Sequence, residues 1–337
     1  MPAIRPGFRT PPASRRALLI AGAAALAAPA VRAQRARTIR FAHHVTTQSE
    51  QHAAAEMFAR RVAELSANAL AVQVLPAAQM GGQREIIESV SLGTLEMGYG
   101  ESGLYANYTP PFGIIALPYL YRDFAHFERT VEGPVGAQLA RDLEAKAGIR
   151  VMNWMTAGYR NTFLRTRPIR VPADFRGVKI RLPEAPVFVR TFATLGAQPT
   201  PIPAPEMYSA LQTGVVDAME GSAEVGFTFR IHEVTKFLSL TRHILLDGSF
   251  AMNAGFFAGL PKPQQDAVSQ AATEAGKWQR AQHFEREKMW LDRLAAAGTL
   301  QTNPVELGPF IQALGPLQDE FAGAARGADL LRQIRAL

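Results

Sequence analysis

The sequence predicts an α/β fold, because segments with strand-like and helix-like spacing of apolar residues alternate along most of the chain. The chain has 337 residues, of which 47% are hydrophobic and 19% charged, so it can form a full core and is not disordered. Chains longer than about 250–300 residues usually divide into lobes. We therefore expect two α/β lobes, a largely parallel sheet, and binding groups beyond the strand ends.

The elements expected first follow a simple alternation. Apolar residues recur every fourth position at Ala54, Phe58 and Val62, as on a helix, and every second position at Leu70 and Val72, as on a strand. The expected elements are a strand over 38–43, a helix over 49–67, a strand over 70–75, a helix over 83–92 and a strand ending near Tyr99.

The segment from 171 to 221 has the order strand, helix, loop, helix, strand. We expect a strand over 178–182, a helix over about 186–195, a proline-rich loop over 199–205, a helix that starts at Pro205 and ends before Gly214, and a strand over 215–219. In the first strand Val178 and Ile180 share one face, whereas Arg181 takes the other. Pro183 follows closely, so the guanidinium of Arg181 should point off the edge of the sheet.

A further helical pattern runs from 263 to 297 with apolar residues at spacings near three and four. Gly276 is the only internal glycine, and no proline follows Pro263 within the pattern. A helix of this length usually contacts more than one packing partner.

The N-terminal residues are typical of a cleaved signal peptide over 1–33. Arg15 and Arg16 precede an uncharged run over 17–31, and Val31-Arg32-Ala33 offers a cleavage site before Gln34. The run is too short for a transmembrane helix, and the paired arginines favour the twin-arginine route to the periplasm. Five arginines and no acidic residue lie in 1–33, so the net charge of +7 falls to +2 without them. This is not the charge of a nucleic-acid-binding surface.

Several motifs occur together in one order. The strand segment contains Gly177, Lys179, Ile180, Arg181 and Pro183, which match a G-x-K-[IL]-R-[VL]-P pattern. Further matching segments are LGAQPTPIPAPEMYSALQTGVVDAMEG (195–221), AAEMFARRVAELS (54–66), GGQREIIESVSLGTLEMGYGES (81–102), ALPYLYRD (116–123) and GYRN (158–161). In these motifs the chain resembles the periplasmic solute-binding subunits of tripartite ATP-independent periplasmic (TRAP) transporters, the DctP-type family.

The resemblance implies a two-lobed periplasmic binding protein with a cleft between its lobes and a long helix that crosses both. Lobe I is expected over 34–157 and 246–285, and lobe II over 158–245 and 286–337. Such a protein is not an enzyme. It closes on an organic acid, delivers it to the membrane permease subunits, and does not itself span the membrane.

The resemblance also implies the binding residues. Arg181 takes the place of the arginine that grips the carboxylate of the ligand, and the planar guanidinium suits this role because it forms two parallel hydrogen bonds with a carboxylate. Arg160 matches a second arginine near the carboxylate, and Glu101, His44 and Tyr208 fall at further cleft positions. Gly221 stands where many relatives carry a carboxylate-binding Asn, and Ala204 stands where sialic-acid binders carry an aromatic residue. These two departures argue against sialic acid as the ligand.

Other chemistries lack support in the sequence. The glycines of 98–103 match G-x-G-x-x-G, but Pro110 and Pro111 interrupt the long helix that a dinucleotide site requires. No G-x-S-x-G motif occurs, and His43, His44 and His52 are not part of a recognised metal-ligand pattern, so we expect no cofactor and no metal. Two alternatives to transport remain: a binding protein that presents its closed form to a receptor kinase, and a periplasmic enzyme that acts on small acids.

Overall fold

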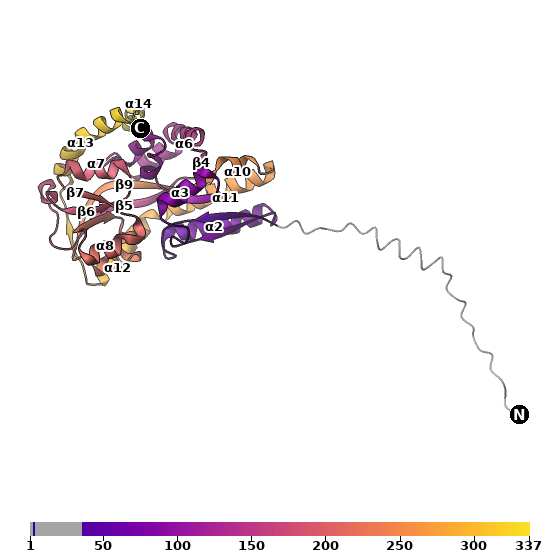
Figure 1. The fold of residues 1–337 in the computed structure, drawn as a ribbon, viewed down its shortest axis with the longest axis horizontal. Helices are drawn as coiled ribbons and strands as arrows, with labels where there is room; N and C mark the ends of the chain where they lie inside the picture. Colours follow the sequence, from indigo (N-terminus) through magenta and orange to yellow (C-terminus); the bar gives the residue numbers. More distant parts are fainter. Residues whose placement is uncertain (1–2, 4–35) are drawn as a thin grey trace. The chain divides into compact units, whose positions relative to one another are not determined.

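The expected alternation of strands and helices is present in the computed structural model, which describes Ala3 and residues 36–337 (Figure 1). Apart from Ala3, the predicted signal peptide lies outside the described residues. Residues 36–337 form one compact unit.

The first five elements lie where the sequence predicts them, with bounds that differ by at most two residues. They are β1 (Arg37–Ala42), α2 (Glu50–Leu65), β2 (Leu70–Leu75), α3 (Gln83–Leu92) and β3 (Met97–Gly100). The Ser49 hydroxyl caps α2 by accepting a 3.1 Å hydrogen bond from the backbone N–H of His52. Gly93 ends α3 with a φ of 75°, a conformation that glycine adopts without a steric penalty. Local caps therefore determine where α2 begins and where α3 ends.

The next elements build the rest of the first half of the fold. They are α4 (Ser102–Tyr105), the 3-10 helix η1 (Pro110–Ala116), α5 (Phe124–Glu132), α6 (Pro134–Ala147), β4 (Ile149–Val151) and β5 (Met155–Leu164). The helix after β3 is only four residues long, as the proline pair at 110 and 111 predicts.

The segment that carries Arg181 differs from the prediction at three places. It contains η2 (Pro172–Phe175), β6 (Lys179–Leu182), α7 (Pro186–Thr194), β7 (Gln198–Pro201), η3 (Ala204–Glu206), α8 (Met207–Thr213) and β8 (Ala218–Gly221). The expected proline-rich loop thus begins with an edge strand, and the strand predicted over 215–219 starts three residues later and ends two residues later. The helix predicted to start at Pro205 starts at Met207, after the short η3. The edge position explains β7, because prolines are tolerated where their missing N–H faces away from the sheet.

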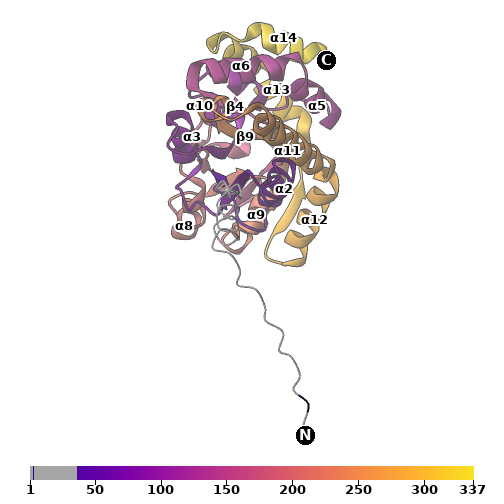
Figure 2. The same ribbon diagram turned by 90° about the vertical axis from the view of Figure 1, so that its right-hand side faces the viewer.

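The C-terminal part also corrects the prediction of one long helix. It contains α9 (Ala223–Thr228), η4 (Ile231–Glu233), β9 (Phe237–Asn253), α10 (Ala254–Ala258), α11 (Lys262–Ala281), α12 (His283–Ala296), β10 (Gln301–Pro304), α13 (Leu307–Ala324) and α14 (Ala328–Ala336). The helical stretch is divided at Gln282. Its two parts pack on different partners, α11 on α2 and α12 on α9, and Figure 2 shows them following one another along one side.

The strands form one mixed sheet rather than a largely parallel one. Their order is β2-β1-β3-β9-β5-β8-β6-β7, and β4 and β10 also pair with β9. The pairs β1–β2, β1–β3, β6–β7 and β6–β8 are parallel, whereas β9 runs antiparallel to β3, β4 and β5. The 17-residue strand β9 pairs with β3 near its end and with β5 along most of its length, so it joins the two halves of the sheet.

Helices cover both faces of the sheet. Over the half that contains β6, Figure 1 shows α7 and α13 on one face and α8 and α12 on the other. Three apolar clusters fill these layers: one joins α3, α6, α7 and α13, a second lies between β1, α2 and α11, and a third lies between β8, α8 and α12. The core is therefore continuous on one side of the sheet and divided in two on the other. The C-terminal helices follow the continuous side, since α13 packs against α7 and α14 against α6.

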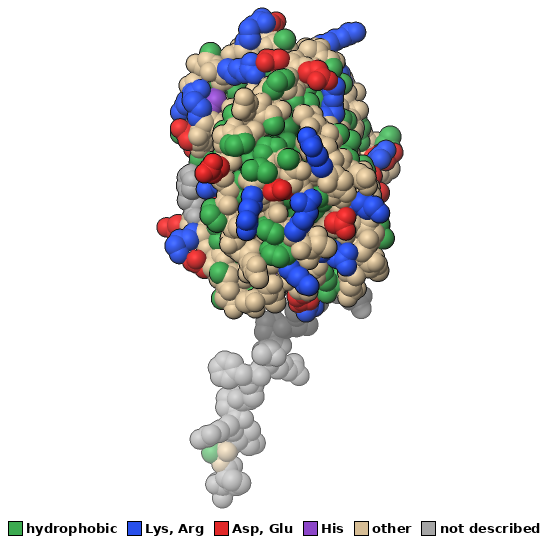
Figure 3. All heavy atoms as spheres, turned by 90° about the vertical axis from the view of Figure 1, so that its left-hand side faces the viewer, with side chains coloured by type: hydrophobic (Ala, Val, Ile, Leu, Met, Phe, Trp, Pro, Cys, Tyr) green, Lys and Arg blue, Asp and Glu red, His purple; other side chains and the backbone are tan. Residues whose placement is uncertain are grey.

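The surface in Figure 3 carries interspersed basic and acidic side chains with hydrophobic groups between them. Within the described residues, no helix combines the length and the apolar character that a membrane crossing requires.

Candidate functional site

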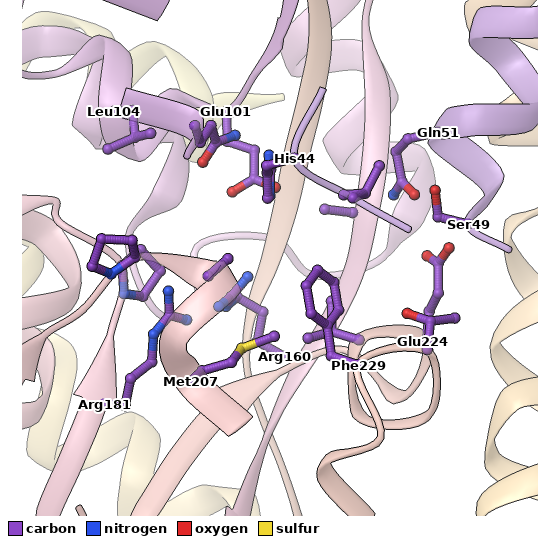
Figure 4. A pocket seen from close by; sticks show the side chains of 18 of the residues that line it. His44, Ser49, Gln51, Glu101, Leu104, Arg160, Arg181, Met207, Glu224 and Phe229 are labelled. Atoms are coloured by element: carbon purple, nitrogen blue, oxygen red, sulfur yellow. The ribbon is translucent and has the colours of Figure 1, made fainter. Parts of the chain in front are cut away.

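A cavity lies where side chains from the two halves of the fold face one another. About 60 Å³ of this cavity is open to water, which is enough room for more than one water molecule. His44, Ser49, Gln51 and Glu101 point into it from one side, and Arg160, Arg181, Met207, Glu224 and Phe229 point into it from the other (Figure 4). The remaining lining residues are Val45, Gln83, Leu104, Ala157, Pro183, Glu184, Pro203, Ala204, Val225 and Thr228.

Arg181 enters the cavity from β6 and is only 4% exposed. Its Nε donates a 2.7 Å hydrogen bond to the carbonyl oxygen of Ile202, which directs the side chain. Within residues 36–337 no hydrogen bond or ion pair engages its two terminal amino groups. Burial lowers the pKa of Arg181 to about 10, and the charge of Arg160 adds to this effect while that of Glu220 opposes it. The site therefore holds a buried cation whose charge is incompletely compensated by the protein.

Arg160 lies on β5 and has a different environment. Its Nε donates to Oε2 of Glu220, and its Nη2 donates to Oε1 at 2.7 Å and to the backbone oxygen of Glu220 at 3.1 Å. Glu220 also accepts a 3.1 Å hydrogen bond at Oε2 from Nε2 of His243. Burial opposes ionisation of Glu220, but Arg160 and His243 together outweigh it and lower the pKa of Glu220 to about 2. This ion pair fixes Arg160 and neutralises most of its charge.

His44 and Glu101 lie on the opposite side of the cavity from Arg181. Burial lowers the pKa of His44 to about 3, assisted by His43 and the two arginines, so its ring is neutral at pH 7. The Nδ1 atom of His44 is buried without a hydrogen-bond partner. Burial raises the pKa of Glu101, although Arg160 opposes the change. The predicted neighbour His43 is packed instead, with its Nε2 3.0 Å from Nδ1 of His52.

The structure does not bring Tyr208 or Gly221 to this cavity. The Tyr208 hydroxyl donates a 3.2 Å hydrogen bond to Oε2 of Glu233. Gly221 is the last residue of β8 and pairs with Asn161 of β5. A Cβ atom at Gly221 would lie 2.9 Å from Cε of Met219 and 3.3 Å from Cγ1 of Val225, so the position faces protein side chains. Four of the six residues predicted for the site, His44, Glu101, Arg160 and Arg181, do line the cavity.

Sequence reasoning missed the polar residues at the end of the cavity near α2 and α9. Gln51 lies in the first turn of α2, and Glu224 lies in the first turn of α9, which the Ser222 hydroxyl caps. A Ser followed by an acidic residue in the next turn is a recognisable helix start, but it does not show that Glu224 faces a cavity.

Glu224 also lines a smaller neighbouring cavity, whose lining includes Glu50 and Trp290. Its Oε1 accepts a 2.8 Å hydrogen bond from the backbone N–H of Glu50, and Trp290 Nε1 donates to the Glu50 side chain at 3.3 Å. Burial raises the pKa of Glu50 to about 7, and burial together with the charge of Glu50 raises the pKa of Glu224 to about 8. Near neutral pH the pair therefore retains at least one proton.

Among the residues that the structure describes, no group of three or more His, Asp or Glu side chains is arranged to hold a metal ion. The polar groups of the cavity are a cation, carboxyl groups, amides and a neutral imidazole, which suit hydrogen bonding to an organic ligand.

Comparison with known proteins identifies the fold and the family. The model of the bacterial extracellular solute-binding proteins of family 7, DctP, matches residues 41–324. The chain is 33% identical over 320 residues to the 2,3-diketo-L-gulonate-binding periplasmic protein YiaO of Escherichia coli (strain K12), covering 94% of this chain and 96% of that protein.

Two solved structures are also similar. A TRAP periplasmic solute binding protein from Roseobacter denitrificans with bound β-D-glucuronate has 29% identity and a TM-score of 0.85, over 89% of this chain and 99% of that one. A TRAP periplasmic solute binding protein from Sulfurospirillum deleyianum with bound succinate has 27% identity and a TM-score of 0.84, over 89% and 98%. The predicted two-lobed α/β fold, periplasmic location and non-enzymatic role are thereby confirmed. The chain belongs to the bacterial extracellular solute-binding proteins of family 7, the DctP family of TRAP transport systems.

Proposed function

We propose that this protein captures an organic acid by a direct ion pair between Arg181 and the carboxylate of the ligand, and then delivers the acid to TRAP permease subunits in the membrane. The solved relatives support a carboxylate ligand, since β-D-glucuronate and succinate both carry one. The family supports delivery to a permease rather than signalling or catalysis.

The incomplete hydrogen bonding of Arg181 is the observation that carries this proposal. A buried charge is costly unless it is paired, and Arg181 has one hydrogen bond to a neutral carbonyl oxygen. Arg160, by contrast, already has the Glu220 carboxylate. A ligand carboxylate would supply the missing partner for Arg181 and would lie close enough to Arg160 to benefit from its residual field.

We further propose that the ligand closes two lobes, 34–157 with 246–285 and 158–245 with 286–337, which bend about β5 and β9. The cavity lies on the side of the sheet where the core is divided, and residues from both lobes line it. A ligand that contacts both sides stabilises the closed arrangement over the open one, and this differential affinity drives closure.

Calorimetric titration of wild type, Arg181→Lys and Arg181→Ala with an acid found by a thermal-shift screen tests the ion pair. Lysine cannot form the two parallel hydrogen bonds, so we expect Arg181→Lys to lose about 1.5–3 kcal/mol, or roughly 10- to 100-fold in affinity. Arg181→Ala should lose more, because the carboxylate is then buried without a partner.

The matched control is Arg190→Ala, which removes an arginine that pairs with Glu320 and does not line the cavity. Its affinity should equal that of wild type. Equal affinities for wild type, Arg181→Lys and Arg181→Ala would exclude the ion pair.

A further inference from the structure

Two buried carboxyl groups meet where the proposed lobes touch beside the cavity. Glu50 lies in the first turn of α2, in lobe I, and Glu224 lies in the first turn of α9, in lobe II. They are 6% and 7% exposed, and both line the smaller cavity. The backbone N–H of Glu50 donates to Oε1 of Glu224 at 2.8 Å, and the Gln51 side chain hydrogen-bonds the same carboxyl group. These bonds join the two lobes, so opening of the lobes would break them.

A second contact joins the lobes near Arg181, which lies at the opposite end of the cavity from Glu224 (Figure 4). Arg84 on α3 forms a 3.3 Å ion pair with Glu184, and the Asn107 side chain donates a 3.4 Å hydrogen bond to the backbone oxygen of Glu184. Opposite charges meet at this end, whereas two acidic groups meet at the Glu224 end. The two contacts should therefore respond differently to a change in pH.

The charges around the acidic pair do not neutralise it fully. Arg286 on α12 acts through its charge on both carboxyl groups, and Glu287 of the same helix adds a further acidic side chain to the lining of the smaller cavity. Gln279 and Trp290 donate to the Glu50 side chain at 3.3 Å, but neither carries a charge. Two ionised carboxylates would thus repel each other across the contact between the lobes.

The pair holds protons while the lobes are closed. Burial raises the pKa of Glu50 to about 7, and burial together with the charge of Glu50 raises the pKa of Glu224 to about 8. Opening would expose both groups to water and return their pKa values toward 4.5, so closure takes up protons. Tyr99 and Tyr159 lie near the pair, but burial raises their pKa values and they stay neutral at pH 7. Glu101 lines the larger cavity and its pKa is also raised, so variants have to separate its titration from that of the pair.

We propose that Glu50 and Glu224 form a proton-dependent latch between the lobes: the pair holds at least one proton when the lobes close, so capture of the acid takes up protons and weakens as the pH rises. This regulation rests on the proposed function above, because it acts on the closure that the ligand drives. The contact between Arg84 and Glu184 closes the same lobes without such a requirement, since opposite charges attract without a proton.

Calorimetric titration of the wild type measures the proton uptake directly. The probes are D-glucuronate, D-erythronate and L-galactonate, each with one carboxyl group that stays ionised between pH 6 and 8.5. Titration at pH 7 in two buffers of different ionisation enthalpy should show that about one proton is taken up per acid bound. The affinity should be at least about tenfold lower at pH 8.5 than at pH 6, because each proton taken up changes affinity by about tenfold per pH unit.

Two variants assign this uptake to the latch. The double variant Glu50→Gln/Glu224→Gln keeps the shape of both side chains and removes their charges, so its affinities at pH 6 and 8.5 should agree within about threefold and its proton uptake should fall close to zero. Glu101 is intact in this variant. Arg84→Ala is the matched control, because it breaks the other contact between the lobes: it should weaken binding by the same factor at both pH values and keep the proton uptake.

The outcomes separate the latch from the proposed function. Binding without proton uptake, together with a radius of gyration that falls on saturation, would overturn the latch while the proposed function stands. Unchanged uptake in the double variant, with the protein folded by circular dichroism, would assign the protons to another group and also overturn the latch. Equal affinity of wild type and Arg181→Ala would contradict the proposed function instead, and failure of all three acids to bind would count against both.

Discussion

Replacing Glu220 by Gln should strongly destabilise the fold, because this change breaks the buried ion pair between Arg160 and Glu220. The side chain of Glu220 has no exposed surface, and its pKa is lowered from 4.5 to about 2. A pKa shift of this size corresponds to about 3 kcal/mol of folding free energy. Glutamine keeps the shape but leaves the Arg160 guanidinium buried without its counter-ion, so we expect a loss of about 3–5 kcal/mol at pH 7.

The pH dependence identifies the origin of this loss. A carboxylate whose pKa is lower in the folded state stabilises the fold above the unfolded pKa, and this contribution disappears as the pH falls through the folded value. The difference between wild type and Glu220→Gln should therefore be constant above about pH 6.5 and shrink below about pH 4.5. His43 and His44, with pKa values lowered to about 4 and 3, reduce stability in acid in both proteins, whereas His243, whose pKa burial lowers and Glu220 raises, also contributes to the difference below about pH 6.5.

Urea denaturation at a series of pH values from 7.5 to 3 measures this difference. Glu320→Gln is the matched control, because Glu320 pairs with Arg190 at the surface, where an ion pair contributes about 0–1 kcal/mol. A loss below about 1 kcal/mol for Glu220→Gln at pH 7, or a difference that does not change in acid, would refute the reasoning.

Three further predictions concern packing, titration and closure. Gly248→Ala should destabilise the fold by about 1–3 kcal/mol in thermal denaturation, since its Cβ would lie 2.3 Å from the Tyr99 hydroxyl, whereas Gly323→Ala on α13 meets nothing within 4 Å and should gain about 0.5–1 kcal/mol. The free energy of unfolding should fall from about pH 4.5 to about 8 and then level off, because Glu50 and Glu224, with pKa values raised from 4.5 to about 7 and 8, keep protons in the folded state that the unfolded chain releases. Replacing both by Gln should flatten that slope, and an unchanged slope would assign it elsewhere. In small-angle scattering the radius of gyration should fall when a bound acid saturates the site, and a constant value would contradict closure.

Much of the fold follows from local signals in the sequence. The strand over 70–75 and the helix over 83–92 have the predicted bounds because alternation and a glycine cap determine them. The division between α11 and α12 has no such signal, since neither glycine nor proline occurs near Gln282. Tertiary packing causes it, because each helix has its own partner, α2 or α9.

The candidate site shows the same division between local and tertiary information. Arg181 could be located because a strand followed by proline marks where its side chain leaves the sheet. The pairing of Arg160 with Glu220 and the approach of Glu224 to Glu50 join residues 60 and 174 positions apart, and no spacing rule reports such contacts. The resemblance to a family supplied Arg160, Glu101 and His44, whereas Gln51 and Glu224 required the structure.

The edge strand β7 has a consequence for the behaviour of this protein at high concentration. The backbone N–H groups of Gln198 and Ile202 donate to β6, at the carbonyl oxygens of Val178 and Leu182, and the alternation of a strand places Thr200 on the same side. The positions that face outward, 199 and 201, are both proline and carry no N–H. This border of the sheet therefore offers an incoming strand no donors over these residues, which protects the protein against edge-to-edge aggregation while a carbonyl just beyond the strand holds Arg181 in place.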